Sequence, residues 1–180
     1  MLIGFSGKKG SGKTCAANYL VKNYSFKLKS FATPLREQAK NMFGFKDSDF
    51  SLLYKEKPFL HYDWCPREFM THLGQFMRYH DPEYWINRIG LDKVYNYCVD
   101  DLRFKNEAKH IKNMGGILIR IERYKSFNPY AQGDMNTDIS EVDLDNAEFD
   151  YTVDASNNVT LEDLYKMLDK IMATLGKKKT

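Results

Sequence analysis

The sequence contains no long apolar run. No stretch approaches the roughly 20 consecutive apolar residues that a membrane-spanning helix needs. The first residues, MLIGFSGKKGSGKT, also lack the apolar segment of a signal peptide. Cysteine is scarce, because Cys15, Cys65 and Cys98 are odd in number and too widely spaced for a disulfide framework or a metal-type pair. We therefore expect a cytoplasmic protein with reduced thiols and no membrane partner.

The chain also carries little excess charge. A formal net charge of +3 is too small to predict nucleic acid as the main ligand, so we expect no nucleic-acid partner. The four histidines lack ligand spacing and do not favour a metal site. Charge is nevertheless uneven, because residues 1–60 hold eleven Lys and Arg against four Asp and Glu. That excess suits a phosphorylated small ligand, although a solvated surface would show the same bias.

No repeat, low-complexity stretch or Pro/Gly linker divides the chain, and 180 residues fit one domain. Apolar runs of strand type alternate with amphipathic helical patterns. The predicted strands are residues 2–6, 26–31, 94–99, 117–121 and 151–153. The predicted helices are residues 13–24, 67–80, 82–91 and 106–114, with two more that begin at Thr33-Pro34 and Thr160. This alternation predicts an α/β fold, a mostly parallel sheet with helices on both faces.

The most informative segment is Gly7-Lys8-Lys9-Gly10-Ser11-Gly12-Lys13-Thr14, which matches the Walker A pattern G-x-x-x-x-G-K-[ST] in full. It follows an apolar strand and precedes a helical pattern, which is the context that this motif requires. Glycines allow successive backbone N–H groups to point inward at an anion, and the helix adds its positive end. We therefore predict a P-loop NTPase three-layer sandwich. The residues predicted to hold the phosphates of ATP are Gly7, Lys9, Gly10, Ser11, Gly12, Lys13 and Thr14.

Three further features favour phosphoryl transfer. Asp100 and Asp101 end an apolar strand, where a carboxylate would help Thr14 to hold Mg²⁺, and we favour Asp101. Arginines that could clamp phosphates recur at positions 36, 78, 88, 103, 120 and 123. The polar stretch of about 124–150 has the length and composition of a lid, or of a loop with no role.

In several stretches the chain resembles the phage-type deoxynucleoside monophosphate kinases, a branch of the P-loop nucleoside monophosphate kinase fold. Besides the Walker A segment, the matching stretches are Ser30-Phe-Ala-Thr-Pro-Leu-Arg36, Leu73-Gly-Gln-Phe-Met-Arg78, Asp101-Leu-Arg-Phe-Lys-Asn-Glu107, Gly115-Gly-Ile-Leu-Ile-Arg-Ile-Glu-Arg123 and Ser140-Glu141. Their order spans nearly the whole chain. The family's lid run, Asp-x-His-x-Ser-Glu, reads Asn136-Thr-Asp-Ile-Ser-Glu141 in this sequence.

The resemblance implies an enzyme that uses ATP and Mg²⁺ to phosphorylate deoxynucleoside monophosphates. It implies a catalytic Lys13, Asp101 with Arg103 near the transferring phosphoryl group, and Arg123 at the start of the lid. It also implies Arg78 and Arg36 on the acceptor side, within a helical region of about 34–92. We add Arg88 as an acceptor contact, and Phe76 and Trp85 as rings that could stack on a base.

Two other readings stay open. A small P-loop kinase with a hydroxyl acceptor, such as a dephospho-coenzyme A or sugar-acid kinase, could use Asp101 as its base. An ATP-dependent scaffold would bind ATP without acceptor-dependent release of ADP. A GTPase switch is not favoured, because the sequence has no Asn-Lys-x-Asp motif. The sequence leaves open a homodimer, the identity of the accepted base and the role of residues 46–66.

Overall fold

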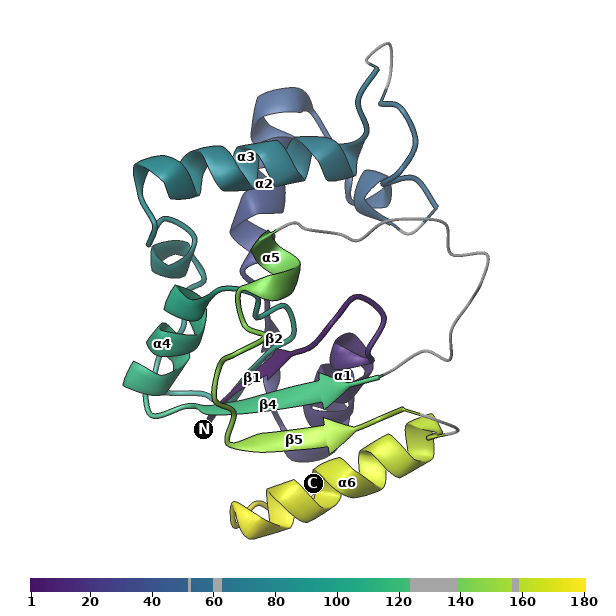
Figure 1. The fold of residues 1–180 in the computed structure, drawn as a ribbon, viewed down its shortest axis with the longest axis vertical. Coiled ribbons are helices and arrows are strands. Elements are labelled where there is room, and N and C mark those ends of the chain that lie inside the picture. Colours follow the sequence, from purple (N-terminus) through teal and green to yellow (C-terminus); the bar gives the residue numbers. More distant parts are fainter. Residues whose placement is uncertain (52, 60–62, 124–138, 157–158) are drawn as a thin grey trace. The chain divides into compact units, whose positions relative to one another are not determined.

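A computed structural model describes residues 1–51, 53–59, 63–123, 139–156 and 159–180 of the chain (Figure 1). The chain forms two compact units. Unit 1 combines Met1–Ser30 with Leu91–Thr180, and unit 2 is the intervening segment Phe31–Gly90. Unit 2 nearly coincides with the region of about 34–92 that the sequence predicts to bind the acceptor, and that role stays a prediction.

Unit 1 is built on a five-stranded sheet in which every pair of neighbouring strands is parallel. Its strands are β1 (Leu2–Ser6), β2 (Lys27–Lys29), β3 (Tyr97–Val99), β4 (Ile117–Glu122) and β5 (Tyr151–Asp154). They lie in the order β2-β3-β1-β4-β5, so β1 is central and its neighbours β3 and β4 come from much later in the chain. The predicted parallel α/β sheet is therefore confirmed.

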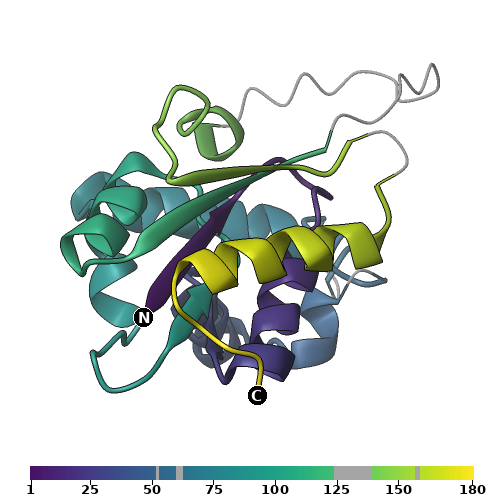
Figure 2. The same ribbon diagram turned by 90° about the horizontal axis from the view of Figure 1, so that it is seen from below.

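Helices cover both faces of this sheet. The helices of unit 1 are α1 (Lys13–Tyr24), α4 (Lys105–Asn113), α5 (Ile139–Val142) and α6 (Leu161–Thr174). The helices α1 and α6 contact each other on one face of the sheet, and Figure 2 shows α6 crossing α1 there. Alternation along β1 explains the layering, because successive side chains of a strand point to opposite faces. Ile3 and Phe5 are fully buried with α1 and α6, whereas Gly4 faces Leu118 and Ile111 on the α4 side.

Unit 2 consists of α2 (Ala32–Phe43), the 3₁₀ turn η1 (Asp47–Phe50), α3 (Pro66–His80) and the 3₁₀ turn η2 (Ile86–Arg88). Aromatic side chains pack together within and beside residues 46–66, which the sequence left unassigned. Neighbouring rings lie with centroids 4.2 to 6.5 Å apart in the cluster Phe43, Phe45, Phe50, Phe59, Trp64 and Phe69. Phe45 is the buried member of the cluster, at 4% exposed, whereas Phe43 is 37% exposed.

Element boundaries agree with the sequence patterns in most places. The helix Lys13–Tyr24 is confirmed in full, whereas α2 begins at Ala32 and places Pro34 inside its first turn. Proline is tolerated there, because the first N–H groups of a helix have no partner within the helix. The predicted helix at 82–91 is wrong, since only η2 forms there. No helix among the described residues is long and apolar enough to cross a membrane.

Candidate active site

The Walker A loop lies between the end of β1 and the start of α1, and its glycines adopt conformations that other residues avoid. Gly7, Gly10 and Gly12 have φ values of 145°, 80° and 105°. At Gly7 a Cβ atom would also lie 2.3 Å from the carbonyl oxygen of Ile121, a backbone atom that cannot move aside cheaply. The loop therefore needs glycine at this point both for its backbone conformation and for its close approach to β4.

Lys13 lies at the first position of α1, directly after the loop. Its ammonium group donates to the carbonyl oxygens of Gly7 at 2.7 Å and Lys8 at 2.9 Å. Burial, together with the nearby positive charge of Arg103, lowers the pKa of Lys13 to about 8, although the acidic side chains around it oppose this shift. The ammonium is thus held among the loop carbonyls in a partly desolvated position, where an anion would be attracted strongly.

Two adjacent carboxylates at the end of β3 have different partners. The hydroxyl group of Thr14 donates to Asp100 Oδ2 at 2.8 Å, which joins the P-loop helix to β3. The hydroxyl group of Ser30, at the end of β2, donates to Asp101 Oδ2 at 2.6 Å. The sequence predicts Asp101 as the partner of Thr14 in holding a metal ion. The structure instead brings Asp100 to Thr14 and Asp101 to the β2 side.

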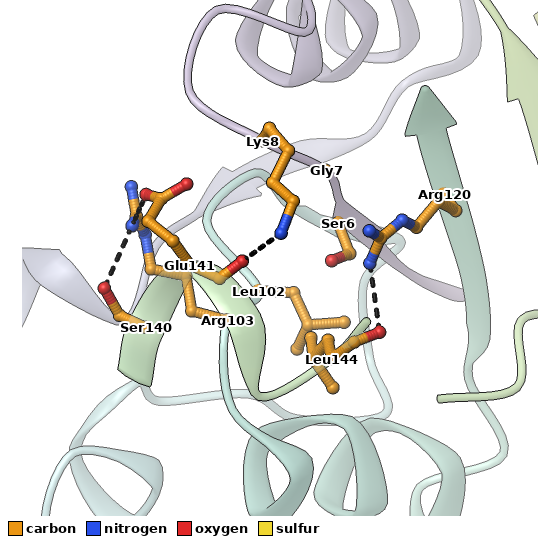
Figure 3. A pocket seen from close by; sticks show the side chains of 9 residues that line it. All are labelled: Ser6, Gly7, Lys8, Leu102, Arg103, Arg120, Ser140, Glu141 and Leu144. Carbon is orange, nitrogen blue, oxygen red and sulfur yellow. Dashed lines mark hydrogen bonds and ion pairs between the residues drawn. The ribbon is translucent and has the colours of Figure 1, made fainter. Parts of the chain in front are cut away.

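A pocket beside the loop is lined by residues from four parts of unit 1 (Figure 3). Its lining comprises Ser6, Gly7, Lys8, Leu102, Arg103, Arg120, Ser140, Glu141 and Leu144. The three cationic side chains, Lys8, Arg103 and Arg120, come from the loop, from the segment after β3 and from β4. Arg103 is among the site residues predicted from the sequence and Arg120 is among the arginines that could clamp phosphates, whereas the sequence predicts no role for Lys8.

The cations of this pocket pair with α5 and the turn that follows it. Lys8 donates to both carboxylate oxygens of Asp145, at 2.6 and 2.7 Å, and to the backbone carbonyl of Glu141. Arg103 forms an ion pair with Glu141, and Arg120 donates to Asp145 Oδ1 at 3.0 Å. The hydrogen bond from Lys8, helped by the one from Arg120, holds the pKa of Asp145 below its usual range, so this carboxylate stays ionised.

The donor set around Thr14 fits Mg²⁺. A hydroxyl oxygen and a carboxylate oxygen lie within 2.8 Å of each other at the start of α1, and both are hard ligands of the kind that Mg²⁺ prefers. Among the described residues, no cluster of three or more His, Cys, Asp or Glu side chains could hold a metal. Mg²⁺ does not require one, because it commonly binds through one or two carboxylates together with substrate phosphates.

One buried polar atom of the loop has no protein partner. Ser11 is only 2% exposed, and its hydroxyl oxygen makes no hydrogen bond within the described residues. A buried hydroxyl without a partner is unfavourable. The loop that is predicted to bind phosphate therefore also contains an unused donor.

The predicted acceptor residues lie in unit 2. Arg36 is exposed on α2, Arg78 is half-buried on α3, and the guanidinium of Arg88 lies 3.5 Å from the ring centre of Tyr84. Phe76 is 60% exposed on α3. Trp85 is only 1% exposed and donates its indole N–H to the carbonyl of Gly74, so we correct its assignment from a stacking ring to a core residue.

The remaining predicted residues lie near the end of β4. Arg123 follows the strand, and its Nε donates to the carbonyl of Ala155 at 3.0 Å, a contact that ties the ends of β4 and β5 together. Most of the predicted lid, residues 124–138, lies outside the described residues. Within the described part of the lid, α5 and the turn after it contact the P-loop, as the pairs of Lys8 with Glu141 and Asp145 show.

A glycine-rich loop that joins the central strand of a parallel sheet to a helix, with a lysine and a hydroxyl at its end, defines a P-loop nucleotide-binding protein. A protein of Acanthamoeba polyphaga mimivirus is 32% identical to the chain over 188 residues, which cover 93% of this chain and 94% of the relative. That relative's name describes it, provisionally, as a deoxynucleotide monophosphate kinase. The chain belongs to the deoxynucleotide monophosphate kinase family and is therefore a P-loop kinase.

No protein-family model matches the chain. Among solved structures, it is similar to the tunicamycin resistance protein of Deinococcus radiodurans, at 14% identity and a TM-score of 0.49, with 99% of this chain and 97% of that chain covered. It is also similar to thymidylate kinase of Candida albicans, at 13% identity and a TM-score of 0.43, with 97% and 92% covered. The family assignment rests on the mimivirus relative and not on these structures.

Proposed function

We propose that the chain transfers the γ-phosphoryl group of ATP to the 5′-phosphate of a deoxynucleoside monophosphate and releases ADP and a deoxynucleoside diphosphate. One observation carries this proposal. A complete Walker A loop, with Lys13 at its end and Thr14 bonded to Asp100, occurs in a chain that is 32% identical to a relative named as such a kinase. ATP as the donor and a deoxynucleotide as the acceptor are both part of the proposal.

The loop residues would bind the phosphates of ATP. The backbone N–H groups of residues 7–14 and the positive end of α1 offer donors to the β- and γ-phosphates. Lys13 would exchange its bonds to the Gly7 and Lys8 carbonyls for phosphate oxygens, and its ammonium would neutralise negative charge during transfer. The unpaired hydroxyl of Ser11 would gain a partner in the same step.

Thr14 and Asp100 would hold Mg²⁺. Asp101, the next residue in the sequence, accepts a hydrogen bond from Ser30 and is not proposed as a ligand. When bound, the ion neutralises phosphate charge and orients the γ-phosphoryl group. The protein's own part is to keep the Thr14 hydroxyl and the Asp100 carboxylate 2.8 Å apart, so that both oxygens face one position without a large rearrangement. Such pre-organised positioning accounts for much of the catalysis in phosphoryl transfer.

The acceptor phosphate would be held by arginines. We propose Arg78 and Arg36, with Arg88 as a further contact, because guanidinium groups bind phosphate in a bidentate way. An oxygen of the acceptor phosphate attacks the γ-phosphorus. The bond between the γ-phosphorus and the oxygen that bridges the β- and γ-phosphates breaks, and ADP leaves with the electron pair of that bond. The acceptor is already ionised at neutral pH, so no general base is required. Arg103 would stabilise the charge of the transferring group.

Release of ADP in a coupled assay tests this function. The assay would contain ATP and Mg²⁺ with dAMP, dGMP, dCMP, dTMP or their ribose counterparts as acceptors. We expect acceptor-dependent turnover, and we expect Lys13→Ala to reduce it by about a thousandfold or more, since one charge that stabilises the transition state is removed. If ATP binds and no monophosphate stimulates ADP release, the proposed acceptor is wrong. Product analysis would then test a hydroxyl acceptor.

A further inference from the structure

The carboxylate of Glu141 makes contacts that resemble those of a bound phosphate. Its Oε2 atom accepts a hydrogen bond from the backbone N–H of Lys9, within the Walker A loop, at 3.4 Å. Its Oε1 atom accepts one from the guanidinium of Arg103. Only 14% of the Glu141 side chain is exposed, so this anion is withdrawn from most of the solvent. Loop amides and guanidinium groups are the donors that hold phosphate oxygens in P-loop sites.

The surroundings of Glu141 strengthen this resemblance. Lys8, another residue of the loop, donates to the backbone carbonyl of Glu141 (Figure 3). Its ammonium group also donates to both carboxylate oxygens of Asp145. An ammonium group has three N–H donors, so these three hydrogen bonds use all of them. Two acidic side chains from one short segment therefore engage a loop amide, a loop lysine and Arg103.

The backbone of Arg103 is held by contacts that do not involve Glu141. The carboxylate of Glu107, a residue only 2% exposed, accepts hydrogen bonds from the backbone N–H groups of Arg103 at 2.9 Å and Phe104 at 3.1 Å. This capping interaction fixes the backbone at the start of α4. Loss of the negative charge at position 141 would therefore leave the backbone of Arg103 in place, and its guanidinium would lose an anionic partner and could bind another anion.

We propose that Glu141 is an internal competitor for the phosphate site. Its carboxylate occupies donors that the phosphates of a nucleotide require, so binding of the nucleotide includes displacement of Glu141. The apparent affinity for the nucleotide is then lower than the intrinsic affinity by the fraction of molecules in which Glu141 has moved away. This inference rests on the proposed function only in that the loop binds a polyphosphate, and it does not depend on the acceptor.

Calorimetric binding of ATP and of inorganic tripolyphosphate to full-length Glu141→Gln tests the proposal, in the presence of EDTA so that no metal contributes. Glutamine keeps the size of the side chain and removes its charge. We expect both ligands to bind about fivefold more tightly than to the wild type, because an anion that competes for the site is lost. The matched control is Glu162→Gln, since Glu162 is exposed on α6 and the net charge changes equally.

Several outcomes would overturn the proposal. Unchanged or weaker binding of tripolyphosphate to Glu141→Gln would show that Glu141 supports the site rather than competing for it. An equal gain in Glu162→Gln would reduce the effect to net charge, and an equal gain in affinity for adenosine would exclude a phosphate-specific cause. Glu141→Ala provides a second variant with the same expected direction if the glutamine variant does not fold. Because binding is measured without an acceptor, a failed kinase assay would leave this result intact.

Discussion

At the scale of single residues, Asp100 and Asp101 are neighbours in sequence with separate partners, Thr14 and Ser30. If the Thr14 hydroxyl and the Asp100 carboxylate together hold Mg²⁺, Asp100→Asn should raise the Mg²⁺ concentration for half-maximal activity by about tenfold, because a neutral amide is a weaker ligand than a carboxylate. Asp101→Asn is the matched control and should change it by much less. A titration of activity with Mg²⁺ distinguishes them. A larger shift in Asp101→Asn would restore the assignment made from the sequence.

The pKa of Lys13 predicts how nucleotide binding depends on pH. Burial lowers this pKa from 10.5 to about 8, so the folded protein loses the ammonium charge as the pH rises through 8. Affinity for ADP in EDTA should therefore be nearly constant between about pH 7 and 8, where the phosphates of ADP are ionised. Above pH 8 it should weaken, by up to about tenfold for each pH unit. The same depression means that burying the charged Lys13 costs stability below pH 8, and that this cost is relieved between pH 8 and 10.5.

Lys13→Arg provides the control for that pH dependence. An arginine keeps its charge throughout the range, so the affinity of this variant for ADP should stay flat between about pH 7 and 9.5. Fluorescence titration with a labelled ADP at half-unit steps of pH would measure both proteins. A flat profile for the wild-type protein would mean that the ammonium of Lys13 is not the charge that holds the phosphates.

A sequence reveals functional residues that belong to a local motif, but it does not reveal residues that only long-range contacts bring together. The Walker A glycines follow from spacing alone, and the φ value of Gly7 and its approach to Ile121 explain why that spacing is needed. The contact between Lys8 and Glu141 joins residues 133 positions apart, and no periodicity encodes it. The predicted role of Trp85 is wrong because an aromatic residue can either pack in a core or stack on a ligand. The sequence does not distinguish these roles, whereas the burial of Trp85 in the structure does.

At the scale of elements, strong periodicity predicted the sheet and α1, whereas tertiary contacts decided the ambiguous segments. Residues 82–91 have a helical pattern that opens with Asp81-Pro82, yet Asp81 accepts a hydrogen bond from the backbone N–H of Glu83 and starts a turn. The predicted strand 94–99 begins only at Tyr97, because the backbone N–H groups of Val94 and Tyr95 donate to the side chain of Asp92. Hydrogen bonds from nearby side chains to the backbone compete with the backbone hydrogen bonds of helices and strands. A single sequence does not show which of the two forms.

The start of α6 shows a local signal that the structure confirms. Thr160 is the N-cap, its hydroxyl accepts from the backbone N–H of Asp163 at 3.2 Å, and the Asp163 carboxylate accepts from the backbone N–H of Thr160 at 3.1 Å. Thr160→Ala should lower the free energy of unfolding by about 1 kcal/mol, because an N–H group at the helix start loses its partner. Urea denaturation would measure the loss. Thr160→Ser keeps the hydroxyl and should remain near the wild type, and equal losses in both variants would contradict a capping role.

At the scale of the whole molecule, the proposed roles divide between the two units. The predicted contacts with ATP and Mg²⁺ all lie in unit 1, on the P-loop and at the end of β3, whereas Arg36, Arg78 and Arg88 belong to unit 2. The sequence predicted this helical insertion as an acceptor-binding region by resemblance. It did not predict the aromatic cluster that includes Phe45, Phe59 and Trp64, because those rings follow no helical or strand period.

This division predicts that variants in unit 2 affect one substrate alone. Arg78→Ala should raise the KM for the deoxynucleoside monophosphate by about tenfold to a hundredfold, since a charged contact to the acceptor phosphate is lost. The KM for ATP should change by less than about twofold, because the proposed contacts with ATP all come from unit 1 and Arg78 is not among them. Arg67→Ala is the matched control, as Arg67 lies on the same helix and pairs with Glu56. Steady-state kinetics with each substrate varied in turn would measure both constants. A parallel rise in the KM for ATP, or an equal effect of Arg67→Ala, would show that Arg78 acts through the fold of unit 2 and not through the acceptor phosphate.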